Sequence, residues 1–267
     1  GGEMKMKEEK GVFSTRLRTD FGECDFLKRL KISAVLKYLA ETSGLDYAQK
    51  GYPHRCLLEK GEVFLLTRIS CRFHKDVGEE QPLCVTTFEV GTKGALFYRD
   101  FEIFTESGEK AISARTAWVL CDPVSRKILA PGSFERKIGG EVSRRADAPE
   151  PKKLHLPDHM QPALQYTVRY SDLDGNGHLY NARYADIAAD ALPFDLWKKS
   201  SVREFEINFQ AEAKEGDILT VDTADTAWSA EGQKEVFVFG KIGETESFRC
   251  RFSFSSLSSP SMDQAEA

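Results

Sequence analysis

The sequence predicts an α+β protein built from two similar units, each a long central helix wrapped by a curved antiparallel sheet. Three observations lead to this fold class. The 267 residues suffice for two domains. A pattern of strand, long helix and four further strands occurs twice, and the copies align at an offset of 149 positions, from Phe21 to Tyr170 (170 − 21). We expect the units at 12–132 and 161–255, joined by a polar linker at 133–160.

The first unit opens with an alternating segment, 13–21, that is typical of a half-buried strand. The next segment, 30–47, has apolar residues at spacings of three and four, which predicts one long helix with Ser33 near its start as a cap. A loop containing Gly and Pro follows. Runs of β-branched and aromatic residues then predict four strands, at 63–73, 83–90, 94–104 and 111–120.

The second unit repeats this order. It has an alternating strand at 164–170 and a helix at 181–192, for which Asn181 is the expected N-cap. Alanines in both helices fit a helix that is buried in the concave face of a sheet. Four strands are expected to follow, at 202–211, 218–226, 235–242 and 246–255. The terminal segments 1–11 and 256–267 offer little to bury and are expected to be disordered.

Charge and cysteine content exclude several classes of function. The chain has 37 Lys and Arg against 42 Asp and Glu, a net charge of −5, which disfavours nucleic acid as a partner. No run of about 18 apolar residues predicts a membrane span. The six cysteines form no Cys-x-x-Cys pair and have no histidine at zinc-ligand spacing, so we expect reduced thiols, a cytoplasmic protein, and no metal or organic cofactor.

The densest polar signal lies just before the second helix, in Tyr170-Ser-Asp-Leu-Asp-Gly-Asn-Gly-His-Leu-Tyr-Asn181. Asp174, Asn176 and His178 stand at i, i+2 and i+4, and in an extended segment this period points all three side chains the same way. A carboxylate, an amide and an imidazole that converge can orient water and stabilise charge. These three residues are therefore the candidate catalytic group.

This segment and the two-copy layout resemble the acyl-acyl-carrier-protein (acyl-ACP) thioesterases of plants and bacteria. The resemblance covers about residues 12–255 and is most specific at 170–184. It implies two tandem hot-dog units and hydrolysis of fatty acyl thioesters on acyl carrier protein, which ends chain elongation. It also assigns catalytic roles to Asp174, Asn176 and His178.

A further catalytic Glu-Cys pair of the resembling family falls on Glu212 and Ala213. The glutamate is present and the cysteine is absent, so we expect attack by water with Glu212 as general base and His178 as its partner. Asn176 would hold either the imidazole or the thioester oxygen. Asp174 would position His178, although a nucleophilic role for it stays open. A backbone amide of the 175–179 turn and helix start is expected to serve the oxyanion.

The first unit has lost this group, because Leu27 and Arg29 align with Asn176 and His178. We therefore expect the C-terminal unit to be catalytic and the N-terminal unit to hold the acyl chain. The candidate residues for the apolar slot are Val35, Leu39, Phe64, Leu66 and Phe88.

Alternative interpretations remain at this point: an acyl-CoA thioesterase, a non-catalytic acyl-binding or regulatory hot-dog protein, and, with less support, a hot-dog dehydratase. A homodimer is compatible with the sequence. Basic clusters could bind an acidic acyl carrier protein; they are Lys28, Arg29, Lys31, Arg136, Lys137, Arg144, Arg145, Lys152, Lys153, Lys198 and Lys199.

Overall fold

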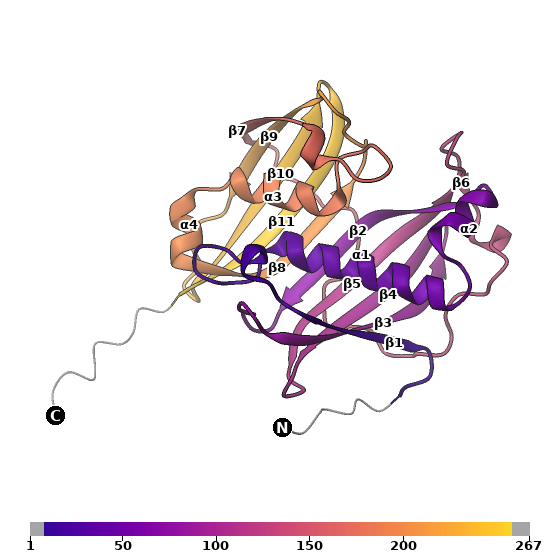
Figure 1. The fold of residues 1–267 in the computed structure, drawn as a ribbon. Helices are drawn as coiled ribbons and strands as arrows, with labels where there is room; N and C mark the ends of the chain where they lie inside the picture. The colour runs from indigo at the N-terminus through magenta and orange to yellow at the C-terminus, as the bar shows by residue number, and fades with distance from the viewer. Residues whose placement is uncertain (1–7, 258–267) are drawn as a thin grey trace.

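The computed structural model describes residues 8–257 and contains two halves, each with a helix lying across a sheet (Figure 1). In the N-terminal half, the long helix α1 runs from Ile32 to Gln49 and a short helix α2 from His54 to Glu59. The strands of this half are β1 (Val12–Arg18), β2 (Val63–Phe73), β3 (Pro82–Lys93), β4 (Leu96–Thr105), β5 (Lys110–Cys121) and β6 (Ile128–Leu129).

The C-terminal half repeats the arrangement with a shorter central helix, α3 (Asn181–Asp190), and a short helix α4 (Phe194–Lys199). Its strands are β7 (Gln161–Thr167), β8 (Ser200–Phe209), β9 (Ile218–Asp225), β10 (Gln233–Ile242) and β11 (Thr245–Ser256).

All eleven strands form one antiparallel sheet in the order β1-β3-β4-β5-β2-β8-β11-β10-β9-β7, with β6 paired to β5. The halves join where β2 pairs with β8, through the register Ile69 to Ile207 and Ser70 to Glu206. Reading outwards from this junction, each half has the same order of equivalent strands. This is the tandem hot-dog architecture expected from the sequence.

The 149-residue offset is confirmed in the backbone itself. Short 3-10 turns occupy Phe21–Glu23 and Tyr170–Asp172, and isolated bridges pair Cys24 with Leu30 and Leu173 with Leu179. Each member of the second set lies 149 positions after its counterpart. The loop that enters each long helix is therefore the same structure built twice.

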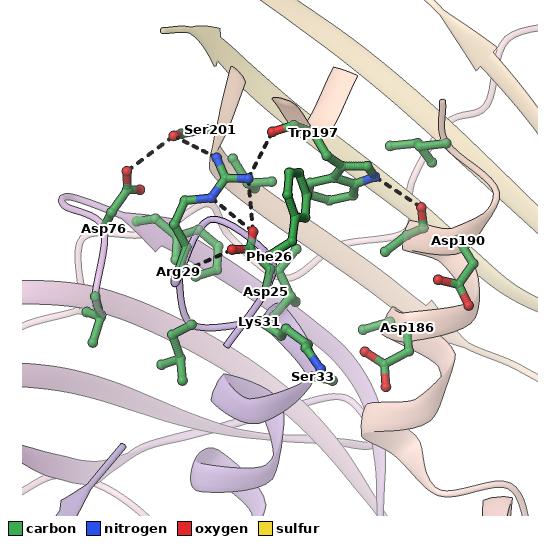
Figure 2. A pocket seen from close by; sticks show the side chains of 18 of the residues that line it. Asp25, Phe26, Arg29, Lys31, Ser33, Asp76, Asp186, Asp190, Trp197 and Ser201 are labelled. Carbon is green, nitrogen blue, oxygen red and sulfur yellow. Dashed lines mark hydrogen bonds and ion pairs between the residues drawn. The ribbon is translucent and has the colours of Figure 1, made fainter. Parts of the chain in front are cut away.

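In the N-terminal half, this loop connects the two halves through Arg29 (Figure 2). Its guanidinium donates to Asp25 Oδ2 at 2.9 Å, to the carbonyl of Ser200 at 2.7 Å and to that of Trp197 at 2.9 Å. Arg29 stands at the position equivalent to His178. The residue that replaced the histidine thus links the 25–29 loop to the start of β8.

One hydrophobic core serves both halves, since α1 and α3 pack on the same face of the sheet and on each other. On the opposite face, the 133–160 segment covers part of the sheet. The amide of Ala146 donates to Asp100, and the guanidinium of Arg144 lies 4.6 Å from the ring centroid of Phe88. Because both faces are covered there, β3 is buried continuously from Leu83 to Glu89 and does not alternate.

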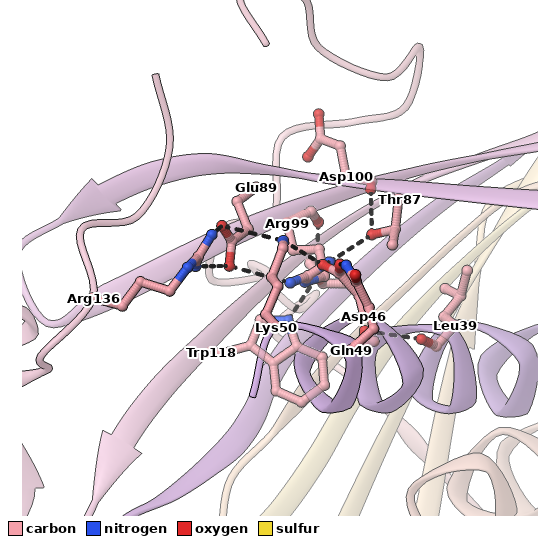
Figure 3. Close-up of polar contacts among 12 residues, drawn as sticks. Leu39, Asp46, Gln49, Lys50, Thr87, Glu89, Arg99, Asp100, Trp118 and Arg136 are labelled. Carbon is pink, nitrogen blue, oxygen red and sulfur yellow. Dashed lines mark hydrogen bonds and ion pairs between the residues drawn. The ribbon is translucent and has the colours of Figure 1, made fainter. Parts of the chain in front are cut away.

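A buried cluster of charges joins the end of α1 to the sheet (Figure 3). Arg99 is 2.7 Å from Asp46 Oδ2 and 3.3 Å from Glu89 Oε1, and Arg136 binds both carboxylate oxygens of Glu89 at 2.8 Å. Burial raises the pKa of Asp46 and of Glu89, but the neighbouring cations outweigh it, so the net pKa of each carboxyl is lowered.

Several local expectations are wrong. Ser33 lies inside α1, whose N-cap is Lys31, and Asn181 is the first residue of α3, whose N-cap is Tyr180; neither cap forms a side-chain hydrogen bond. The short helices α2 and α4 were not expected. The predicted terminal disorder falls mostly outside the described residues, but the amide of Val12 donates to the carbonyl of Glu9, and β11 extends to Ser256.

Candidate active site

The segment that carries the predicted catalytic group is a closed loop and not an extended strand, which corrects the expectation drawn from its spacing. Asp174 Oδ1 accepts hydrogen bonds from the amides of Asn176 (2.9 Å) and His178 (3.2 Å). The amide of Asp174 donates to the carbonyl of His178 at 2.8 Å. Gly177 adopts a φ of 78°, in the left-handed region that glycine enters without strain.

The equivalent loop of the N-terminal half has the same hydrogen bonds. Asp25 Oδ1 accepts from the amides of Leu27 and Arg29, both at 2.9 Å, and Lys28 takes the positive φ, 62°, that Gly177 takes in the second copy. The aspartate therefore shapes the loop in a copy that lacks the histidine and the asparagine. This favours a positioning role for Asp174.

Glu212 is brought to this loop by backbone pairing. The amide of Leu179 donates to the carbonyl of Ala213 at 2.8 Å, and His178 forms a β-bridge with Lys214. From α3, the hydroxyl of Tyr184 accepts a hydrogen bond from the amide of Ala213 at 3.0 Å. The sequence carries no signal for this contact of Tyr184.

As a result, His178 Nε2 lies 3.7 Å from Glu212 Oε2, although the residues are 34 positions apart (212 − 178). Both side chains are partly exposed, His178 at 23% and Glu212 at 35%, so a solvent molecule can reach both. The side chain of Asn176 is exposed and, within residues 8–257, accepts or donates no hydrogen bond. Of its two predicted roles, holding the imidazole is therefore not the one adopted in this structure.

Arg126 is a neighbour of the site that the sequence did not suggest. It belongs to the turn after β5, where Asp122 Oδ1 accepts from the amides of Val124 and Ser125, and its own φ is 61°. From there its guanidinium contacts Glu212 Oε2, the oxygen that also faces His178. A residue of the N-terminal half thus completes the surroundings of a carboxylate of the C-terminal half.

Four of the five backbone amides of 175–179, the segment expected to supply an oxyanion donor, form hydrogen bonds within the structure. The amides of Asn176 and His178 donate to Asp174 Oδ1, that of Gly177 to the Asp174 carbonyl, and that of Leu179 to Ala213. Within residues 8–257, the amide of Gly175 and the exposed carboxamide of Asn176 donate no hydrogen bond, so both stay available as donors.

No disulfide joins the six cysteines, and one thiol lies near the site. Cys121 ends β5 and is close enough to Arg126 and Glu212 for their charges to act on it, but its side chain is buried. Burial raises the pKa of the Cys121 thiol, with smaller effects from the neighbouring charges. A protonated, buried thiol is a poor nucleophile.

A cavity of about 220 Å³, here called the smaller cavity, opens beside the start of α3. Asn181, three positions after His178, forms part of its wall, and most of the wall comes from the N-terminal half. Phe64 and Leu66 line it as expected, whereas Val35 and Leu39 lie in the main core and Phe88 packs under Arg144. Glu89 and Arg99 of the buried charge cluster also border it.

Fold and loop geometry together define a two-unit hot-dog protein with a polar loop and a cavity beside it. The profile of the acyl-ACP thioesterase N-terminal domain matches residues 10–130, and that of the C-terminal domain matches residues 157–257. The chain therefore belongs to the acyl-ACP thioesterase family, and it is a thioester hydrolase.

Solved structures share the whole fold. An acyl-ACP thioesterase from Bacteroides thetaiotaomicron superposes with a TM-score of 0.80 at 22% identity, covering 94% of this chain and 100% of the other. The 12:0-ACP thioesterase from Umbellularia californica gives a TM-score of 0.73 at 17% identity, with coverages of 92% and 94%. No curated protein sequence matches the chain significantly.

Two further findings concern possible partners. In residues 8–257, no helix is long and apolar enough to cross a membrane, and no group of three or more His, Cys, Asp or Glu could hold a metal ion. Among the basic clusters, Arg136 and Arg144 pair with Glu89 and Glu102, and Arg29 is tied to the 197–201 segment, so these three side chains are committed within the fold.

Proposed function

We propose that the protein hydrolyses fatty acyl thioesters carried on acyl carrier protein and releases the free fatty acid, in the cytoplasm and without a cofactor. The observation that carries this proposal is the approach of His178 Nε2 to Glu212 Oε2, 3.7 Å, beside a cavity bordered by aromatic side chains. An imidazole and a carboxylate at this separation can hold one water molecule between them.

In the proposed mechanism, that water attacks the thioester carbonyl carbon while Glu212, as general base, takes one of its protons and passes it to His178. The carbonyl oxygen becomes an oxyanion, to which the free carboxamide of Asn176 donates a hydrogen bond. The tetrahedral intermediate then collapses, the carbon–sulfur bond breaks, and the proton held by the histidine passes to the departing sulfur. Asp174 holds the loop, and Arg126 orients Glu212.

The acyl chain would occupy the smaller cavity. Its apolar walls, which include Phe64, Phe97 and Trp118, fit an aliphatic chain. In this arrangement the N-terminal unit (12–132) holds the chain and the C-terminal unit (161–255) supplies the proposed chemistry, while Arg126 acts from the first unit on the second.

The test is turnover of a panel of fatty acyl groups presented on acyl carrier protein and, separately, on coenzyme A. Release of the free fatty acid should be measured by mass spectrometry, because the partly exposed Cys24 and Cys56 would react with thiol-detecting dyes. We expect His178→Ala and Glu212→Gln each to lower kcat by about 10²–10³, the usual effect of losing one catalytic hydrogen-bonding group.

Preference for coenzyme A would replace the proposed carrier and leave the chemistry in place. Binding of acyl groups without release would favour a non-catalytic acyl-binding protein. Variants of both residues that hydrolyse at the parental rate would place the reaction elsewhere.

A further inference from the structure

A second cavity, here called the larger cavity, lies at the opposite end of the paired strands β2 and β8 and shares no lining residue with the smaller cavity. Figure 2 shows side chains that line it. Its volume is about 490 Å³, more than twice that of the smaller cavity. It lies between the 25–29 loop, α3 and the start of β8. Its apolar walls include Ile32, Phe73, Leu192, Trp197 and Val202.

The two cavities are related by the internal repeat. Ala40, Ser43 and Asn181 line the smaller cavity, whereas Ala189, Leu192 and Ile32 line the larger one. The members of each pair are 149 positions apart (189 − 40, 192 − 43, 181 − 32). Ala189 and Leu192 of the larger cavity belong to the C-terminal half, and their counterparts in the smaller cavity belong to the N-terminal half. For Ile32 and Asn181 the halves are reversed. A two-fold axis that relates the halves requires this reversal.

The larger cavity is the more apolar at these positions, because Leu192 replaces Ser43 and Ile32 replaces Asn181. At its wall, the ring centroids of Phe26 and Phe194 lie 4.6 Å apart. Both side chains are at least half exposed, Phe26 at 50% and Phe194 at 59%. Charges of both signs, Lys31 and Asp190 among them, also border it.

The loop at this cavity lacks the imidazole and the carboxamide that the proposed mechanism uses. Leu27 and Arg29 stand where the other copy has Asn176 and His178, and the guanidinium of Arg29 is bound to Asp25 and to two carbonyls. An aliphatic chain in the larger cavity would therefore contact apolar walls that are equivalent by the repeat to those of the smaller cavity. It would meet no counterpart of His178.

We propose that the larger cavity is a non-hydrolytic binding site for an aliphatic chain with a polar head. The chain packs against Ile32, Ala189 and Trp197, and the head stays at the charged rim. A free fatty acid, which is the product of the enzyme, and an intact acyl thioester share this chemistry. The choice of ligand rests on the proposed function, because it takes the smaller cavity as the acyl site.

The experiment uses the full chain and two probes, a fatty acid with a diazirine near its methyl end and the same chain joined to coenzyme A by a non-hydrolysable thioether. After irradiation, labelled peptides are identified by mass spectrometry. We expect labels at two places with at least one probe: the wall of the smaller cavity, around Phe97 and Trp118, and the wall of the larger cavity, at 194–202. The probe that labels 194–202 identifies the head group.

Ala189→Trp and Ala40→Trp form a matched pair, because each alanine lines one cavity and they are equivalent by the repeat. Ala189→Trp should lower labelling of 194–202 at least tenfold and leave that around Phe97 in place, and Ala40→Trp should do the reverse. Thermal unfolding shows whether each variant is folded. If the unfolding temperature of Ala189→Trp falls, Ala189→Phe is used in its place. Three results would overturn the proposal. They are labelling confined to the smaller cavity, no labelling with either probe, and labelling of 194–202 that persists in Ala189→Trp as it does in Ala40→Trp. Turnover of acyl-ACP, measured separately, decides the proposed function independently.

Discussion

Replacing Asp174 by alanine and by asparagine separates the two roles that the sequence left open for this residue. In the structure, Asp174 Oδ1 accepts two amide hydrogen bonds from its own loop, at 2.9 and 3.2 Å, and this bonding recurs at Asp25 where no chemistry is expected. A positioning residue should tolerate asparagine, which keeps an acceptor oxygen, better than alanine. A nucleophile should tolerate neither.

The expected magnitude follows from these two bonds. A hydrogen bond to a charged group contributes about 1.5–3 kcal/mol, so at the lower end the pair contributes about 3 kcal/mol to the order of the loop. If that order is needed to hold His178 and Asn176, Asp174→Ala should lower kcat/KM about 100-fold, since each 1.4 kcal/mol is a factor of about ten. Neutral hydrogen bonds are roughly half as strong, so Asp174→Asn should lower it about tenfold.

The assay is release of free fatty acid from acyl-ACP, with the free energy of unfolding measured on the same preparations. Asp25→Ala is the matched control. It removes the equivalent two bonds from the other copy of the loop, and with them the contact to Arg29, so it should reduce stability at least as much as Asp174→Ala and lower kcat/KM far less. The reasoning is refuted if Asp174→Asn loses more than about 10³ in kcat and is as inactive as Asp174→Ala, because a nucleophilic carboxylate predicts that result.

Three further predictions concern neighbours of the site and of the sheet. Arg126→Met should lower kcat/KM about fivefold, the effect of losing an exposed ion pair of about 1 kcal/mol, and Arg126→Lys should restore part of it in the same assay; an unchanged rate for the methionine variant would remove Arg126 from the mechanism. Cys121→Ala should keep kcat within about threefold, because the reaction proposed here needs no thiolate, and a loss like that of Glu212→Gln would point to a cysteine nucleophile. Burial raises the pKa of Asp100 to about 6, above the unfolded value of about 3.9, so the folded state binds the extra proton and stability should fall by about 3 kcal/mol as pH rises from about 4 to 6. Urea unfolding across that range should show this slope in the parent and not in Asp100→Asn; equal slopes would contradict it.

The sequence predicted the fold well because its signals were periodic and duplicated. The strand at 63–73 was predicted with the bounds it has, and the repeat placed the 25–29 and 174–178 loops in register. The helices α2 and α4 were missed because their six residues span fewer than two turns, too few to display a repeating apolar pattern. The proline before each, Pro53 and Pro193, was the available signal.

The structure brings the predicted residues His178 and Glu212 together, but the geometry expected for the 174–178 segment was wrong. Reading 174–178 as extended ignored that an aspartate can accept hydrogen bonds from the amides that follow it, which closes a loop. The contact of Arg126 with Glu212 spans 86 positions and both halves, so no local pattern could indicate it.

The placement of Arg29 limits how this duplicated protein can change. Restoring chemistry to the first copy would need a histidine at position 29, but an imidazole cannot replace a guanidinium that binds Asp25 and the carbonyls of Trp197 and Ser200 at once. Replacing Arg29 by histidine alone would therefore remove contacts between the two halves, whether or not it supplied an imidazole for the proposed reaction. The first copy therefore stays without the imidazole that the proposed mechanism requires, because Arg29 contributes to the stability of the whole chain.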